Sequence, residues 1–591
     1  MCGIAGLMTA DGTAPAAAVL DRMAAALAHR GPDGRGDYMD ADVAMMQTRL
    51  AIIDLATGDQ PLYAPAGADN GKLALVANGE IYNYVELRQM MSDIDYATGS
   101  DCESMLYLYR EHGLDFAEHL RGMYAVAIHD ADDGALVLAR DPFGIKPLYY
   151  GIAEDGFVFA SEPQALIAAG LVTPAVDAAK RDELLALQFT TGAETIFPGI
   201  YRVLPGETMI VRKGRIAQRA QLAALPPGGP KKLPLDKALY DFDRIITEAV
   251  NVHQRADVPY GMFLSGGIDS SVILAVMRRL NPEPVHALTA GFPGTGVHDE
   301  RAHARDVARA CGAEHDEITV TEDDFWRELP AIAAAMDDPA ADYAVVPSYM
   351  LARKARADCL KVVLSGEGGD ELFAGYGRYR RQTRPAIFGG RKMRHQAILA
   401  GTGVLRDEPL GWRNGIAAAE AEARAYGRNA LQTAQATDIA DWLPNDLLTK
   451  LDRCLMAHGV EGRVPFLDPF VADFAFRLPD SLKVHHRTGK WLLRKWLETA
   501  LPESKPFEKK RGFTVPVGDW IAGQGARLGP LVAAQPGIAE VCDADAVKRL
   551  FGAGADKGQA QWTLLFYALW HRRHIEGADT AGDVFEALDN K

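Results

Sequence analysis

The sequence predicts two domains of different fold class: a mostly antiparallel β-sheet domain, followed by an α/β domain with a parallel sheet. A chain of 591 residues is too long for one hydrophobic core. Apolar runs typical of antiparallel hairpins fill roughly the first 200 residues, whereas strand-like and helix-like runs alternate in the remainder. A stretch rich in proline, glycine and lysine separates the two patterns.

The antiparallel sheet is predicted from hairpin signals. Two alternating apolar runs, 124–130 (YAVAIHD) and 135–141 (ALVLARD), flank the pair Asp133-Gly134. The run 148–162 (LYYGIAEDGFVFASE) carries a second Asp-Gly pair in its middle. Because Asp-Gly between such runs is typical of a tight turn, we expect two β-hairpins here.

The parallel sheet is predicted from alternating elements in the second half. A short buried-strand run at 258–265 (VPYGMFLS) precedes a helical run at 270–280 (SSVILAVMRRL). The same order recurs with 285–292 (VHALTAGF) and 299–311 (DERAHARDVARAC), and another strand run lies at 359–366 (CLKVVLSG). Such alternation indicates strands joined by crossover helices.

The domain boundary is predicted from a change in amino-acid composition. A Pro-Gly-Glu turn at 205–207 opens it, and the stiff, polar segment 226–232 (PPGGPKK) follows. We therefore expect a first domain over residues 1–210, a linker over 211–236 and a second domain over 237–591.

Composition and charge exclude several classes of protein. A formal net charge of −16 argues against a protein that follows a nucleic-acid backbone, because such binding requires a basic face. The six cysteines lack the paired spacing of a disulfide framework or a zinc site, which favours a reducing compartment. The sequence shows neither a secretory leader nor a membrane-spanning stretch. We therefore expect a cytoplasmic protein that binds neither nucleic acid nor membrane.

Cys2 is the first candidate nucleophile. Removal of Met1 would leave a thiol and a free α-amino group on the same residue. A thiol with a pKa of about 8.5 and an amine with a pKa of about 8 are well matched for proton exchange at neutral pH. Cys2 would then carry both a nucleophile and its base, although a cysteine at this position also occurs by chance.

Six short motifs support a catalytic interpretation of Cys2. They are MCGIAG (1–6), HRGPDG (29–34), RLAIIDL (49–55), NGEIYN (78–83), GSD (99–101) and RDPFGIKPLYY (140–150). In order and spacing they resemble the glutaminase domain of class II glutamine amidotransferases. The resemblance implies an α+β fold of the N-terminal nucleophile hydrolase type, in which helices cover an antiparallel sandwich in the layer order αββα. It also favours a structural histidine at His29 over a catalytic one.

The resemblance assigns roles that amide hydrolysis requires, namely an oxyanion hole and a clamp for the substrate. It implies that the side chain of Asn78 and the backbone N–H of Gly79 hold the oxyanion, and that Asn78 also contacts glutamine. Arg49 would pair with the glutamine carboxylate, while Glu80 and Asp101 would bind its ammonium group. In isolation, Arg49 would be interpreted as a surface ion pair and Gly79 as a turn glycine.

A second site is predicted at residues 260–271 (YGMFLSGGIDSS), where a strand, a glycine turn and a helix N-terminus meet. Backbone N–H groups at such a point favour a pyrophosphate ligand. The segment resembles the PP-loop of enzymes that cleave ATP between its α and β phosphates, which implies an adenine nucleotide α-hydrolase-like domain. Asp269 would repel phosphate without a cation, for which Mg²⁺ is expected. The residues expected to bind ATP here are Ser265, Gly266, Gly267, Asp269, Ser270 and Ser271.

A second glycine-rich turn is predicted at residues 364–376 (LSGEGGDELFAGY), again directly after a strand. It should stand beside the first loop at the same edge of the sheet. This segment resembles asparagine synthetases, and the resemblance implies that Asp370 joins Asp269 on Mg²⁺. Glu367 would lie near the reacting carboxyl group and ammonia. The resemblance also assigns Leu264, Ala290, Ser365 and Gly366 to the nucleotide pocket.

Basic residues in the segment 487–497 (RTGKWLLRKWL) form a third element. Lys490 and Arg494 are four residues apart, so we expect them on one helical face, directed at the same anion. By resemblance, Lys490 would stabilise the departing pyrophosphate; the alternative is a solvated basic face. The segments 452–468 and 509–520 also resemble the family and are expected to frame the active site.

The resemblance covers nearly the whole chain and implies one coupled reaction. Cys2 would release ammonia from glutamine, and a second site would use ATP to adenylate aspartate, giving asparagine, glutamate, AMP and pyrophosphate. Because free ammonia is mostly protonated in neutral water, we expect an internal channel between the sites. The resemblance also implies a homodimer.

Three alternatives remain open. The same two-site enzyme could amidate another carboxylate, such as a small peptide or a specialised metabolite. The chain could instead be a non-catalytic protein that retains the fold, although the presence of Asp269, Asp370 and Lys490 argues against this. A ligase acting on RNA is a third alternative, which the net acidity disfavours.

Overall fold

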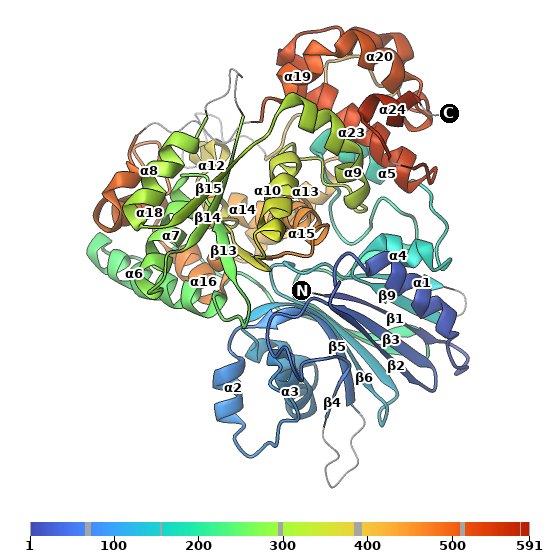
Figure 1. Ribbon diagram of the computed structural model, residues 1–591, viewed down its shortest axis with the longest axis vertical. Helices are drawn as coiled ribbons and strands as arrows, with labels where there is room; N and C mark the ends of the chain where they lie inside the picture. Colours follow the sequence, from blue (N-terminus) through green and yellow to red (C-terminus); the bar gives the residue numbers. More distant parts are fainter. Residues whose placement is uncertain are drawn as a thin grey trace.

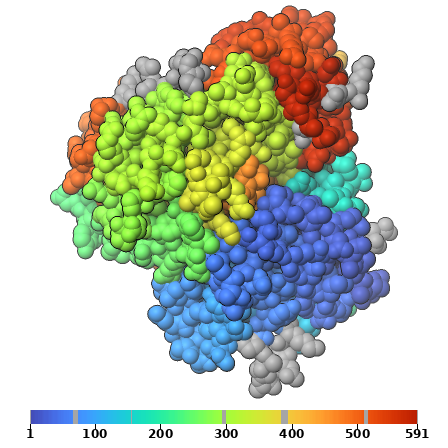
Figure 2. Space-filling view, viewed as in Figure 1, coloured from blue at the N-terminus to red at the C-terminus, as the bar shows by residue number. Residues whose placement is uncertain are grey.

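The computed structural model describes residues 2–64, 73–153, 156–292, 299–382, 393–508, 515–579 and 581–589. Two antiparallel sheets form the N-terminal half of the molecule, and a parallel sheet with surrounding helices forms the second half (Figure 1). In the space-filling view the blue N-terminal half lies directly against green, yellow and orange segments of the second half (Figure 2).

Each sheet of the N-terminal half has six strands, ordered β10-β8-β9-β1-β3-β2 in the first and β12-β11-β7-β6-β5-β4 in the second. The strands of the first sheet are β1 (Gly3–Thr9), β2 (Gly34–Asp40), β3 (Val43–Arg49), β8 (Tyr149–Ala153), β9 (Gly156–Ala160) and β10 (Ile200–Arg202). Those of the second are β4 (Leu62–Tyr63), β5 (Leu73–Ile81), β6 (Gly122–Asp130), β7 (Ala135–Arg140), β11 (Glu207–Arg212) and β12 (Arg215–Gln221).

Alternating side chains on these strands build four layers. In β1, Ile4 and Met8 pack in a core shared with the second sheet, whereas Leu7 belongs to the core beneath the helices. This two-residue period follows from the pleat of a strand. The helices are α1 (Ala17–Leu27) and α4 (Pro163–Ala168) on the first sheet, and α2 (Tyr84–Met90) and α3 (Ser104–His112) beside the second. The predicted αββα sandwich is confirmed.

Both predicted hairpins are present. Strands β6 and β7 pair from Asp130 and Ala135 onwards, and Gly134 in their connection has a φ of +57°, which favours glycine. Strands β8 and β9 also pair as neighbours. Asp155 of the second predicted turn lies outside the described residues.

Strand β12 extends the N-terminal half beyond residue 210. It pairs along β11, so the start of the predicted linker, from residue 211, belongs to the second sheet. Most of its side chains are exposed or half-buried and polar, so it lacks the apolar alternation that predicts a strand. We therefore propose a boundary after Gln221, with a linker that ends where α6 begins at Leu235.

Five strands form the parallel sheet of the second half, in the order β15-β14-β13-β16-β17. They are β13 (Tyr260–Phe263), β14 (His286–Gly291), β15 (Glu314–Thr319), β16 (Val362–Leu364) and β17 (Glu461–Arg463). The chain moves from β13 to β14 on one side and later to β16 on the other. The loops after β13 and β16 therefore meet at the carboxyl edge of the sheet, where α/β proteins bind ligands. The predicted α/β domain is confirmed.

Helices lie on both faces of the parallel sheet (Figure 1). The helices of this part of the molecule include α6 (Leu235–His253), α7 (Ile268–Leu280), α8 (Arg301–Cys311), α10 (Val345–Ala357), α15 (Thr449–Met456), α16 (Pro469–Arg477) and α18 (Trp491–Ala500). Further elements are α5 (Ala178–Leu187), α9 (Glu322–Ala335), α11 (Gly369–Leu372), α12 (Gly377–Gln382), α13 (Asn414–Ala425), α14 (Ala430–Thr437), the π-helical η4 (Asp438–Leu448), α17 (Asp480–Lys483), α19 (Val517–Gly523), α20 (Gly525–Ala533), α22 (Ala544–Phe551), α23 (Gly558–His574) and α24 (Val584–Asp589). In the described part of the chain, none combines the length and apolar character of a membrane span.

A buried lysine in α17 leads to a prediction about stability. The ammonium group of Lys483 donates to Gln435 Oε1 at 3.0 Å and to the carbonyl oxygen of Phe476 at 3.1 Å. Burial lowers the pKa of Lys483 from 10.5 to about 7. Between these pKa values the unfolded chain binds more protons here than the folded protein, so this residue makes the free energy of unfolding rise with pH.

We therefore expect the free energy of unfolding of Lys483→Met to exceed that of the wild type at about pH 7. Between about pH 7 and pH 10 this difference should shrink by up to about 1.4 kcal/mol per pH unit, because the wild type becomes more stable. Urea unfolding of both proteins at several pH values measures the difference. Lys495→Met, which removes a partly exposed lysine, serves as the control. An advantage that grows with pH would contradict this assignment.

Candidate active sites

Cys2 lies directly before β1 and is buried. Its backbone N–H donates to Asn78 Oδ1 at 3.1 Å, and its carbonyl oxygen accepts from Arg30 Nε at 3.2 Å. Burial raises the pKa of the Cys2 thiol, and the carboxylates of Glu461 and Glu80 raise it further. The thiol therefore needs a base before it can act as a nucleophile.

Asn78 offers an unused donor beside Cys2. Its side chain is fully buried, and Nδ2 has no hydrogen-bond partner among the described residues. An orphaned buried N–H group is costly unless a ligand satisfies it. Gly79 follows in β5, and a Cβ there would lie 2.4 Å from the carbonyl oxygen of Met123. Glycine is thus required at this position for strand packing.

Replacement of Asn78 by alanine tests this donor. If Nδ2 stabilises an oxyanion, Asn78→Ala should lower the rate of glutamine hydrolysis by about 10²–10³-fold. Glutamate release measures this rate. Turnover with ammonium in place of glutamine should stay near the wild-type value, which also shows that the variant is folded. An unchanged rate of glutamate release would remove Asn78 from the oxyanion hole.

Arg49 lies at the end of β3, next to Thr48, which pairs with Gly3 in β1. Its Nη1 donates to Asp59 Oδ1 at 2.6 Å, and its Nη2 donates to the carbonyl oxygen of Asp54 at 2.6 Å. The Asp59 side chain is 82% exposed, so another carboxylate can replace it as the partner of Arg49. The geometry therefore permits the predicted contact with the glutamine carboxylate.

Glu80 and Asp101 lie close to this site and are both buried. Asp101 Oδ2 accepts from the backbone N–H of Ile81 at 2.7 Å. Glu80 Oε2 lies 3.2 Å from Nη2 of Arg463, which belongs to β17 of the second half. Burial raises the pKa of both carboxyl groups. Arg463 was not predicted from the sequence, because nothing in its motif indicates so distant a partner.

A buried ionic cluster continues this contact between the halves. Arg30 Nη1 lies 2.6 Å from Glu162 Oε1 and 2.7 Å from Asp452 Oδ2 in α15. Arg453 Nε lies 2.7 Å from Asp337 Oδ1. All these side chains are almost fully buried, so each charge depends on its partner. His29, predicted to be structural, also contacts Glu162, at 3.2 Å.

The predicted PP-loop connects β13 to α7. Gly266 has a φ of +67°, and a Cβ there would lie 3.0 Å from His303 Cδ2. Ser265 Oγ accepts from the backbone N–H of Gly267 at 3.1 Å and lies 3.2 Å from Ser270 Oγ. The loop thus turns so that it presents hydroxyl groups at the N-terminus of α7, which favours an anion. The buried Oγ of Ser271 has no hydrogen-bond partner among the described residues.

The second loop packs directly against the first. A Cβ on Gly366 would lie 3.0 Å from Asp269 Cβ, and one on Gly369 would lie 2.5 Å from Asp269 Oδ1. Both glycines therefore make room for Asp269. Ser365 and Glu367 are linked by a short hydrogen bond between Ser365 Oγ and Glu367 Oε2.

The structure brings Asp269, Asp370 and Lys490 together. Lys490 Nζ lies 2.5 Å from Asp269 Oδ2 and 2.6 Å from Asp370 Oδ1. Lys490 and Arg494 do not both belong to the helix, but the carboxylates of Asp269 and Asp370 act on the charges of both. Lys490 precedes α18 in the left-handed region, with a φ of +54°. Arg494 Nε instead donates to the carbonyl oxygen of Gly489 at 2.9 Å, which ties it to its own loop.

A cavity of about 400 Å³ opens beside these groups. The predicted residues that line it are Leu264, Ser265, Asp269, Ser270, Ala290, Ser365, Gly366, Glu367 and Asp370. The backbone N–H of Leu264 donates to the carbonyl oxygen of Leu288 at 2.8 Å. It is therefore used within the sheet, and recognition of a base there would rest on the apolar side chains.

The far end of the cavity contains residues that were not predicted. Lys450 from α15 is almost fully buried, and its Nζ lies 3.0 Å from Asp342 Oδ2. Burial opposes its charge, but Asp342 and Glu367 raise the pKa of Lys450 above its usual value. Trp442 and Tyr376 add aromatic walls. Part of the predicted frame, residues 509–514, lies outside the described residues.

Gly375 provides a test of this geometry. A Cβ at this position would lie 1.6 Å from Asp370 Oδ1 and 2.4 Å from Lys490 Cε. Gly375→Ala should therefore displace both groups and slow ATP-dependent turnover by about tenfold or more, because displacements near 1 Å are costly in catalysis. Gly377→Ala is the matched control, since its Cβ would meet only the end of the Arg380 side chain at 3.1 Å. Equal ATP-dependent rates for the two variants would contradict the prediction.

Comparison with known proteins assigns both halves of the chain to known families. The family model for asparagine synthase matches residues 241–572, and that for the glutamine amidotransferase domain matches residues 1–221. The chain is 33% identical to asparagine synthetase [glutamine-hydrolyzing] 1 of Bacillus subtilis (strain 168), over 98% of this chain and 97% of the relative. It is 29% identical to asparagine synthetase B [glutamine-hydrolyzing] of Escherichia coli (strain K12), over 83% of this chain and 78% of the relative. The chain therefore belongs to the asparagine synthase family and carries a glutamine amidotransferase domain at its N-terminal end.

Proposed function

We propose that this protein is a glutamine-dependent asparagine synthetase, which converts aspartate, glutamine and ATP into asparagine, glutamate, AMP and pyrophosphate. One observation carries the proposal: a single chain holds both a buried Cys2 beside an orphaned amide donor and an Asp269–Lys490–Asp370 cluster beside a PP-loop. The first arrangement suits amide hydrolysis, and the second suits cleavage of ATP.

The glutaminase reaction begins with Cys2. Removal of Met1 frees the nitrogen that lies 3.1 Å from Asn78 Oδ1, and this amine takes the thiol proton. The thiolate attacks the side-chain amide carbon of glutamine, while Asn78 Nδ2 and the N–H of Gly79 hold the oxyanion. The protonated α-amine then returns its proton to the leaving nitrogen, so that collapse of the tetrahedral species expels ammonia and leaves a thioester. Water hydrolyses the thioester to glutamate and restores the thiol. Arg49 and Asp101 bind the α-carboxylate and ammonium groups of the substrate, and Glu80 shares the second role.

The synthetase reaction uses the second cavity. The PP-loop, from Ser265 to Ser271, holds the phosphates of ATP, and the β-carboxylate of aspartate attacks the α-phosphorus. The bond to the bridging oxygen breaks, which gives an aspartyl adenylate and pyrophosphate. Lys490 moves from the two aspartates to the pyrophosphate and neutralises its charge. Ammonia then displaces AMP near Glu367, which lines this cavity and would accept the proton that is lost.

The donor set fits Mg²⁺. Asp269 and Asp370 come from separate loops, and both reach a single cation, the ammonium group of Lys490. Two carboxylates beside a phosphate loop are the oxygen ligands that Mg²⁺ prefers. When bound, Mg²⁺ would neutralise phosphate charge and orient the triphosphate. We therefore propose Asp269 and Asp370 as its protein ligands.

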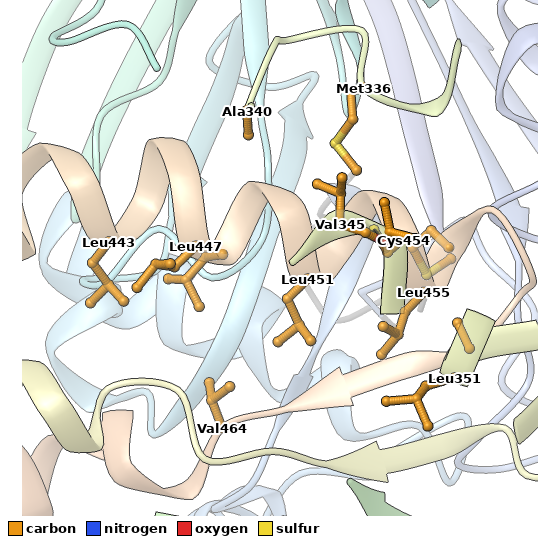
Figure 3. Packing of buried hydrophobic residues seen from close by; sticks show 14 of the residues in the cluster. Met336, Ala340, Val345, Leu351, Leu443, Leu447, Leu451, Cys454, Leu455 and Val464 are labelled. Carbon is orange, nitrogen blue, oxygen red and sulfur yellow. Dashed lines mark hydrogen bonds between the residues drawn. The ribbon is translucent and has the colours of Figure 1, made fainter. Parts of the chain in front are cut away.

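We also propose that ammonia passes along α15. This helix begins near the nucleotide cavity, which Lys450 lines, and then carries Asp452, which contacts Arg30 next to Cys2. Figure 3 shows Leu447, from the preceding helix η4, and Leu451, from α15, in one cluster of buried apolar side chains. Apolar walls would keep water and protons away from ammonia.

Isotope transfer tests the proposed function. The protein is supplied with glutamine labelled with ¹⁵N in the amide, unlabelled ammonium, ATP, Mg²⁺ and aspartate. Mass analysis should detect asparagine that carries mostly ¹⁵N, together with AMP and pyrophosphate. If a panel of other carboxylates, including small peptides, supported pyrophosphate release and aspartate did not, the acceptor would be wrong. If the asparagine contained ¹⁵N and ¹⁴N in the ratio present in the bulk solution, ammonia would have mixed with the solvent, which would contradict an enclosed passage.

A further inference from the structure

A second open cavity, of about 740 Å³, lies on the surface of the synthetase half. It is bounded by α6, α16 and the segment 231–233 that precedes α6. It shares no lining residue with the nucleotide cavity. Helices α6 and α16 contact each other and lie next to the N-terminal half (Figure 1).

The cavity has an apolar floor. Its apolar residues are Leu233, Ile245, Pro469, Phe470, Phe474 and Leu478. Phe470 is 56% exposed, which is unusual for so large an apolar side chain. A ring or chain that covered this floor would remove apolar surface from water and so gain free energy on binding.

The charge around this floor is positive. Glu248 is paired with Arg121 at 2.5 Å, and Asp473 is paired with Arg477 at 2.8 Å. The remaining lining charges are those of Lys231, Lys232 and Arg244, which have no ionic partner among the described residues. In a chain with a net charge of −16, three uncompensated cations around one cavity favour an anionic ligand.

Ion pairs beside the cavity connect the two halves of the molecule. Arg121 comes from the N-terminal half and lies 2.5 Å from Glu248 Oε1 in α6 and 2.7 Å from Asp468 Oδ2, at the start of α16. Its guanidinium group lies over the ring of Phe470, 4.7 Å from the centroid. A ligand on the floor would therefore contact side chains that are held by a residue of the other half.

We propose that this cavity binds an aromatic organic anion, whose ring packs on Phe470 and Phe474 while its anionic group meets Arg244 and the two lysines. The combination of an apolar floor and unpaired cations fits this class of ligand better than it fits a purely apolar or a cationic one. The inference rests on residues outside both active sites and is independent of the proposed function.

Titration of the full-length protein with anilinonaphthalene sulfonate, an aromatic anion that fluoresces when bound, tests the proposal. Saturating ATP and Mg²⁺ are present, so that the nucleotide cavity is filled. We expect saturable binding to the wild type. Arg244→Glu should weaken it by about tenfold or more, which corresponds to about 1.4 kcal/mol. Phe470→Ala should also weaken it, and Arg244→Lys should retain most of the affinity.

Lys237→Glu is the control for the change of charge, because it makes the same change on α6 outside the cavity, although it also removes the exposed ion pair of Lys237 with Asp241. Among the described residues Arg244 has no ionic partner to lose, so reversal of its charge should leave the melting temperature near that of wild type. Added salt should weaken binding to the wild type more than binding to Arg244→Glu. The proposal is overturned if Lys237→Glu weakens binding as much as Arg244→Glu, or if Phe470→Ala leaves it unchanged.

Discussion

Cys2→Ala is expected to abolish glutamine-dependent formation of asparagine and to leave ammonium-dependent formation intact. The variant loses the nucleophile, so glutamate release should fall by about 10³-fold or more. Cys102 cannot replace it, because burial and the neighbouring Asp101 carboxylate raise the pKa of its thiol well above the usual value. Assays of glutamate and asparagine, with glutamine or ammonium as the nitrogen source, measure both activities.

The control for this prediction is Cys359→Ala, which removes an exposed free thiol from the second half. It should change neither activity. Two results would contradict the assignment. One is retention of glutamine use by Cys2→Ala, and the other is loss of ammonium use by a Cys2→Ala protein that still melts like the wild type. The second result would mean that Cys2 serves the synthetase site directly.

Lys490→Met should produce the opposite pattern. The ammonium group of Lys490 contacts both Asp269 and Asp370, and it is the group proposed to neutralise pyrophosphate. Its loss should slow ATP-dependent turnover by about 10²–10³-fold with either nitrogen source, while glutamine hydrolysis continues. Exchange of labelled pyrophosphate into ATP in the presence of aspartate measures the affected step directly.

Lys495→Met is the control, because it removes a lysine of the adjoining helix α18 that pairs with nearby Glu498 and lies over the ring of Phe507. Pyrophosphate exchange should survive in this variant. If Lys490→Met also retained exchange at the wild-type rate, Lys490 would be a structural partner of the two aspartates and not part of the chemistry. Higher Mg²⁺ should not restore the variant, because the lost charge acts on the leaving group.

Together the two variants separate the halves of the reaction. Each half has its own buried site, and the described contacts between them include ion pairs such as Arg30 with Asp452 and Arg463 with Glu80. Breaking one partner of a buried pair leaves an uncompensated charge.

The strands and the motif residues were largely predictable, for local reasons. The alternation in β1 and β5 follows from the pleat, and the PP-loop follows from a strand, glycines and a helix start. Two local features were not predictable from the sequence. Lys490 lies just before its helix, because a left-handed residue leaves no periodic signal. Strand β12 was not predicted, because its side chains are mostly polar and exposed.

The sequence by itself determined the two fold classes, the order of the elements and the residue types at both sites, because periodicity and turn chemistry act over a few neighbouring residues. Only the tertiary structure decided which distant charges meet. Arg30 and Asp452 are 422 residues apart, and no local pattern links them. Among the described residues, Asn78 Nδ2 is left without a partner only because the folded chain buries it. The second cavity, beside Phe470, likewise exists only in the folded chain, because burial and pairing are properties of the whole fold.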